Sequence, residues 1–94
     1  MNLLIRAQAK TQILDATNWY EAQSIGLGLE FTRSIEVAFS IIVRQPKLYA
    51  KFKGEIRRAP MRRFPYSIYY LEDGSNVVVL RCIHQSRNPI TWPH

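Results

Sequence analysis

The chain has 94 residues, of which 47% are hydrophobic, and it carries a net charge of +6 at pH 7. This size allows one small domain, and the hydrophobic content excludes a chain that is disordered throughout. The single cysteine, Cys82, excludes an internal disulfide, the two histidines have no metal-ligand spacing, and no apolar run is long enough to span a membrane. We therefore expect one cytoplasmic domain over residues 1–94, without a metal, a cofactor or a membrane association.

The first half of the chain predicts a short strand and two helices. Residues 3–6 begin with three apolar side chains and suit a short strand, and apolar residues at helical spacing then predict a helix over 7–23. Gly26 is placed to end this helix, because glycine readily takes the left-handed conformation. A second helix is expected over 27–44, with one apolar face made by Phe31, Ile35, Ala38 and Ile42. The short connection predicts an antiparallel helical hairpin.

The middle of the chain predicts a basic loop followed by an interrupted strand. Pro46 ends the second helix, because the residue before a proline avoids helical dihedral angles. Residues 47–54 are expected to form a loop with two aromatic side chains. Residues 55–59 and 62–64 then suit a strand that is bent at Pro60, which indicates a sheet edge or a bulge.

The last third of the chain predicts two stronger strands. They cover residues 66–72 and 76–84 and are joined by Asp-Gly-Ser, a hairpin turn signal. Residues 85–94 are expected to form an irregular tail. The element order β-α-α-β-β-β predicts an α+β fold in which a helical hairpin packs on one face of a small, mostly antiparallel sheet.

The opposite face of this sheet is expected to be uncovered and to bind a partner. Strict alternation along the last strand places Val78, Leu80 and Cys82 on one side and Arg81 on the other. Because a mid-strand arginine needs an open face, we assign Arg81 to the side away from the helices. The strand register stays open, and with it which of four further arginines join Arg81: Arg57, Arg58, Arg62 and Arg63.

The positive charge is concentrated in one segment. Residues 1–43 carry a net charge of −1 and residues 44–94 one of +7, and eight basic residues but one acidic residue lie between Arg44 and Arg63. This concentration favours an anionic partner: a nucleic acid, a ribosomal surface or an acidic protein. The alternative is that these arginines only protect an exposed sheet edge from aggregation.

Five short motifs together indicate a family. They are W-Y-E at 19–21, G-L-G at 26–28, I-R-R-A at 56–59, R-F-P-Y-x-I-Y-Y at 63–70 and H-x-x-R-x-P-x-x-W at 84–92. In this order and spacing they cover essentially the whole chain, which resembles the RelE/ParE toxin superfamily. The resemblance implies the toxin of a bacterial type II toxin–antitoxin module with the β-α-α-β-β-β fold.

The superfamily has two activities, and the resemblance favours one of them. RelE-like members cut mRNA on the ribosome, whereas ParE-like members block DNA gyrase and are not known as enzymes. RelE-like enzymes carry a catalytic arginine directly after the tyrosine that begins the third strand, but here Ser67 follows Tyr66. They often end in a catalytic tyrosine, whereas Trp92 stands in the nearest place and has no hydroxyl. We therefore expect a ParE-like inhibitor of DNA gyrase.

Two alternatives remain at this point. If the chain is a ribonuclease, Arg81, His84 and Arg87 supply the groups that RNA cleavage needs, with His84 as acid or base and the arginines on the phosphate. Against this, His84 lies on the expected core side of its strand, which favours a structural histidine hydrogen-bonded to the tail. The other alternative is a non-toxic co-repressor that acts on DNA together with its antitoxin.

The expected partner is a cognate acidic antitoxin that neutralises the toxin. It is expected to cover the apolar groove beside the helical hairpin and to reach the basic residues, and the chain is expected to meet operator DNA only through this complex. The candidate contact residues are Arg57, Arg58, Arg62, Arg63, Arg81, Arg87 and Trp92. Trp19 and Tyr20 are expected to be core or interhelical contacts.

Overall fold

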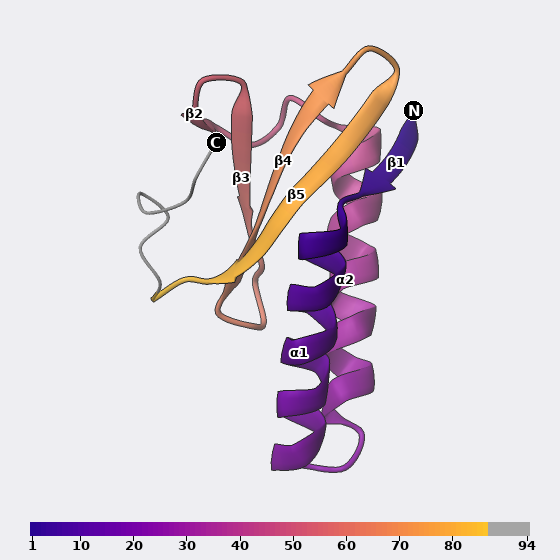
Figure 1. The fold of residues 1–94 in the computed structure, drawn as a ribbon, viewed down its shortest axis with the longest axis vertical. Coiled ribbons are helices and arrows are strands. Elements are labelled where there is room, and N and C mark those ends of the chain that lie inside the picture. Colours follow the sequence, from indigo (N-terminus) through magenta and orange to yellow (C-terminus); the bar gives the residue numbers. More distant parts are fainter. Residues whose placement is uncertain (87–94) are drawn as a thin grey trace.

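Two helices lie side by side against one face of a five-stranded sheet (Figure 1). The computed structural model describes residues 1–86. The elements in chain order are β1 (Asn2–Ile5), α1 (Ala7–Gln23), α2 (Leu27–Arg44), β2 (Lys51–Lys53), β3 (Ile56–Pro60), β4 (Tyr66–Asp73) and β5 (Asn76–His84). The strand order is β1-β5-β4-β3-β2, and the β1–β5 pair is parallel while the others are antiparallel.

The predicted α+β fold and the bounds of both helices are confirmed, whereas the middle of the chain differs from the prediction. Residues 51–53, expected in a loop, form the edge strand β2. Residues 62–64, expected in a strand, form a bend instead. Pro60 is the last residue of β3 because its nitrogen has no proton to donate to a further ladder bond, and Pro65 precedes β4. The residues between these prolines therefore stand outside the sheet.

A β-bulge in β5 changes which side chains face the helices. Tyr69 of β4 pairs with Arg81, but the next residue of β4 pairs with Val79, so Leu80 is an extra residue in β5. A bulge shifts the alternation of side chains beyond it. Cys82 consequently packs with Val79 in the core under the helices, whereas Leu80 belongs to a cluster on the other face. The expectation that Val78, Leu80 and Cys82 share the helix side was therefore right for Cys82 and wrong for Val78 and Leu80.

The main core lies between the helical hairpin and the sheet. Its largest fully buried side chains are Phe31, Ile42, Ile68, Tyr70, Val77, Val79 and Cys82. The other face of the sheet carries a second cluster of Tyr69, Val78 and Leu80, each less than 9% exposed. Phe52 of β2 packs on Tyr69 with a ring-centroid distance of 5.0 Å. The expectation of an uncovered apolar face was therefore wrong for these side chains.

The turn between the helices depends on two glycines and one glutamate. Gly26 has a φ of +91°, a conformation that side chains with a Cβ rarely adopt. Gly28 approaches α1 so closely that a Cβ there would lie 2.9 Å from the backbone oxygen of Thr17. The Glu21 carboxylate accepts hydrogen bonds from the N–H groups of Gly26 and Gly28 at 3.0 to 3.1 Å. Glu21 thereby supplies negative charge at the N-terminus of α2, so the W-Y-E and G-L-G motifs form one structural unit.

Helix α1 also completes the edge of β5. The four residues of β1 pair with β5 only as far as Val79. Further along, the side-chain oxygen of Gln12 accepts a hydrogen bond from the N–H of Cys82 at 2.8 Å, so α1 takes the place of a neighbouring strand. This contact fixes α1 beside the last third of β5. Within residues 1–86, neither helix combines the length and apolar character needed to cross a bilayer.

Candidate functional site

A groove with a volume of about 370 Å³ lies between α2 and the loop from β3 to β4, and we call it the α2 groove. Its apolar lining residues are Val37, Ala38, Ile41, Tyr49 and Met61. Charged lining residues come from both sides: Glu30 and Arg33 from α2, and Arg62 and Arg63 from the loop. Because Pro60 ends β3 just before this loop, both loop arginines stand at the groove and outside the sheet. The groove therefore combines an apolar lining with a basic rim.

The three arginines of the α2 groove differ in their partners. Arg63 forms an ion pair with Glu30 across the groove, and its guanidinium lies 5.4 Å from the ring centroid of Phe64. Within residues 1–86 the structure records no ion pair for Arg33 or Arg62, and both are exposed. Two guanidinium groups are thus available to an anionic partner without breaking a contact within the described chain.

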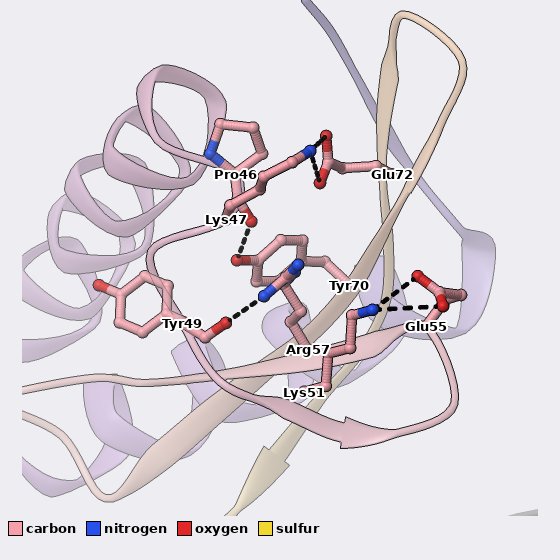
Figure 2. A network of polar contacts seen from close by, with 8 residues as sticks. All are labelled: Pro46, Lys47, Tyr49, Lys51, Glu55, Arg57, Tyr70 and Glu72. Carbon is pink, nitrogen blue, oxygen red and sulfur yellow. Dashed lines mark hydrogen bonds and ion pairs between the residues drawn. The ribbon is translucent and has the colours of Figure 1, made fainter.

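The neighbouring arginines of β3 point to opposite faces of the sheet. Arg58 pairs with Tyr69, and its guanidinium lies 5.7 Å from the ring centroid of Phe52 on the face away from the helices. Arg57 pairs with Tyr70 and donates a hydrogen bond to the backbone oxygen of Tyr49 at 2.8 Å (Figure 2). The register that the sequence left open is thereby decided. Because they lie on opposite faces of the sheet, Arg57 and Arg58 cannot both contact one bound ligand.

Arg57 belongs to a network that fixes the connection from α2 to β2 (Figure 2). The Tyr70 hydroxyl donates a hydrogen bond to the backbone oxygen of Pro46 at 2.8 Å, and burial raises the pKa of Tyr70 to about 12. Lys47 pairs with Glu72 at the surface, which contributes little because solvent screens it. Arg57 therefore has a structural role. It holds the backbone of Tyr49, while Tyr70 holds that of Pro46.

Replacing Arg57 by alanine should lower the free energy of unfolding by about 1–3 kcal/mol, because the Tyr49 carbonyl loses its charged donor. The matched change Arg58→Ala removes an exposed contact with Phe52 and should cost less than about 1 kcal/mol. Urea denaturation of both variants followed by circular dichroism measures the difference. Equal losses would show that Arg57 does not hold this connection.

Arg81 lies on the face away from the helices, as expected, because it pairs with Tyr69 of the outer cluster, and it lies at the sheet edge beside the start of α1. It lines a shallow depression together with Ala7, Gln8, Thr11 and Gln12 of α1. Its guanidinium donates a hydrogen bond to the backbone oxygen of Leu80 at 2.7 Å. Burial and the nearby charge of Arg6 lower the pKa of Arg81. The bulge at Leu80, which no period-two pattern reveals, places Arg81 on this face although Val77 and Val79 of the same strand face the helices.

His84 has the structural role that its strand position favoured. Its Nδ1 accepts a hydrogen bond from the backbone N–H of Ser86 at 3.1 Å and lies 2.8 Å from the Ser86 hydroxyl oxygen. Its ring packs edge-on against Tyr66 at a centroid distance of 5.1 Å. His84 and Arg81 line different depressions, so the described residues do not assemble the expected ribonuclease group. Its third member, Arg87, lies outside the described residues, as does Trp92.

A second groove, of about 600 Å³, lies between α1 and the ends of β4 and β5, and we call it the Trp19 groove. Its rings come from Trp19, Tyr20, Tyr66 and His84. The sequence predicted that Trp19 is a core or interhelical contact, whereas 58% of this side chain is exposed. The signal that pointed to exposure was its position beside, and not within, the apolar stripe of α1 that contains Ala16 and Tyr20.

Comparisons with known proteins agree with this fold. The model of the family described as ParE toxin of type II toxin–antitoxin system, parDE, matches residues 3–89. A solved structure described as the chromosomal ParDE TA system from P. aeruginosa is similar, with a TM-score of 0.76 and 18% sequence identity over 89% of this chain and 95% of that chain. No curated protein matches the sequence. At this identity the solved structure supports the fold, whereas the family model supports membership.

Proposed function

Because the chain belongs to the ParE toxin family of type II toxin–antitoxin systems, we propose that it inhibits bacterial growth by acting on DNA gyrase and that a cognate antitoxin neutralises it. The family resemblance seen in the sequence is thereby confirmed, and the target and the neutralisation are the proposal. The observation that carries it is the α2 groove, with its apolar lining and three arginines. A cytoplasmic location follows from this target.

An acidic amphipathic segment of the antitoxin fits the α2 groove. Apolar side chains of such a segment would cover Ile41 and Met61, while its carboxylates would meet Arg62 and Arg33 at the rim. Hydrogen bonds between guanidinium and carboxylate groups are short and strong, and they fix the orientation of the bound segment. We propose that operator DNA is reached only through this complex.

Two features support a gyrase inhibitor over an mRNA endonuclease. Ser67, which stands where a RelE-like enzyme carries arginine, is 3% exposed and presents no group to a substrate. Arg81 and His84 line separate depressions, which argues against their acting together on one phosphate.

Inducing the chain in bacteria without its antitoxin should stop growth, with DNA breaks and loss of supercoiling before protein synthesis falls. Separate incorporation of labelled thymidine and labelled methionine measures the order of events. Early arrest of translation with cleaved transcripts would contradict the proposal in favour of an mRNA endonuclease. Undisturbed growth would instead favour a co-repressor without toxicity, and co-induction of the antitoxin is the control for specific neutralisation.

A further inference from the structure

Trp19 is a large aromatic side chain held in place at the surface. Its indole packs edge-on against Tyr20, with ring centroids 5.1 Å apart and an interplanar angle of 85°, while 58% of the side chain is exposed. Tryptophan is over-represented among the residues that dominate protein–protein binding, because it buries a large area with few rotatable bonds. A fixed, half-exposed tryptophan beside a groove is therefore a candidate anchor for a partner.

The groove beside Trp19 is largely preformed. His84 is fixed by Ser86 and by the ring of Tyr66, and the side-chain oxygen of Gln12 is held by the Cys82 N–H. Fixed walls lower the entropy lost when a partner binds, which favours affinity. His84, Tyr66 and Gln12 therefore need not reorganise before a partner side chain enters.

The charge of the Trp19 groove is opposite to that of the α2 groove. Asp15 lines it, and among the described residues no lysine or arginine does, although the whole chain carries a charge of +6. The described lining offers no cation to the phosphates of a nucleic acid, and an acidic segment would face Asp15. A basic side chain can contact both the face of the Trp19 ring and the carboxylate of Asp15.

We propose that the Trp19 groove docks a basic segment of the toxin's protein target, with an arginine or lysine side chain over the Trp19 indole and its charge beside Asp15. This inference rests on the proposed function, since it assumes a protein target other than the antitoxin. The two grooves flank different helices, α1 and α2, so the antitoxin and the target use different contact residues. The antitoxin then neutralises the toxin from the α2 groove and does not occupy the Trp19 groove, where the target binds.

Peptide titration tests the chemistry of the groove independently of toxicity. The full chain with Trp92→Phe keeps Trp19 as its single tryptophan, so that emission reports on this groove. A short helical peptide of alanine, leucine and arginine should shift this emission and saturate. A twin peptide with glutamate for each arginine, and a short single-stranded oligonucleotide, should not. Tighter binding of the twin or of the oligonucleotide, or no binding of the arginine peptide, would overturn the proposal.

Calorimetry with the same arginine peptide tests the residues. Trp19→Ala should weaken binding about tenfold or more, and Asp15→Asn should weaken it several-fold. Leu14→Ala is the matched control, because Leu14 is on the same helix and also 58% exposed, but does not line the groove. If Leu14→Ala weakens peptide binding as much as Trp19→Ala does, the peptide binds exposed apolar side chains of α1 and not the groove.

Growth assays then ask whether the groove faces the target. Trp19→Ala should lose growth arrest while it still binds the antitoxin with unchanged affinity, which also shows that the variant is folded, and Trp19→Phe should keep part of the activity. Full growth arrest by Trp19→Ala would overturn the inference and leave the proposed function intact. If the unmodified chain does not arrest growth, the proposed function fails, and the peptide titration still decides what the groove binds.

Discussion

Replacing Arg62 and Arg63 together by glutamate should weaken binding to the antitoxin by about a hundredfold or more and make the remaining affinity nearly independent of salt. Two guanidinium groups at the rim of the α2 groove become carboxylates that face an acidic partner. A hundredfold loss corresponds to about 2.7 kcal/mol, within the range expected for close charge pairs at an interface. The salt dependence falls because an attraction that salt screens is replaced by a repulsion that salt screens in the opposite sense.

Calorimetric titrations over a series of salt concentrations measure both effects. The matched control is Lys51→Glu with Lys53→Glu, which changes the net charge by the same amount on the edge strand β2, outside the groove. Arg62→Glu alone is a second variant, since Arg63 also pairs with Glu30 and its loss could disturb the loop. If the lysine variant binds as weakly as the arginine variant, the overall charge matters and the α2 groove is not the contact.

Replacing Gly28 by alanine should destabilise the chain by about 1–3 kcal/mol, and replacing it by valine should cost more. A Cβ at this position meets the backbone oxygen of Thr17 at 2.9 Å and the Glu21 side chain at 3.0 Å. The backbone oxygen cannot rotate away, so the two helices must separate. The gain of about 1 kcal/mol that alanine normally brings over glycine within a helix does not offset this displacement.

Thermal and urea unfolding of the Gly28 series measures the loss. Ser40→Ala and Ser40→Val provide the scale for the same side chains on α2, because Ser40 is exposed and its side chain makes no recorded contact among the described residues. We expect the cost to rise from alanine to valine at residue 28 and to stay below about 1 kcal/mol at residue 40. Unchanged stability in Gly28→Ala would show that the hairpin has room for a wider separation.

The sequence alone was enough for the family, both helices and the element order apart from the short edge strand β2. Helix bounds depend on local signals, and here these are the apolar spacing, the glycine at 26 and the proline at 46. The strand β5 was also predicted at its observed bounds, because the Asp-Gly-Ser turn marks its beginning. Such signals act within a few residues of each other, so one chain without relatives can reveal them.

The residues of the candidate sites were decided by contacts between distant segments. Arg57 and Arg58 are neighbours in the chain, but the register of β3 against β4 places them on opposite faces. The bulge at Leu80 placed Arg81 on the face away from the helices, opposite to Val79. Whether Trp19 is exposed depends on which side of α1 the sheet and α2 cover, since its neighbour Tyr20 is buried and Trp19 is not. The sequence thus determined the family and the helices through local periodicity, while packing and register, which involve residues far apart in the chain, decided which side chains share a surface.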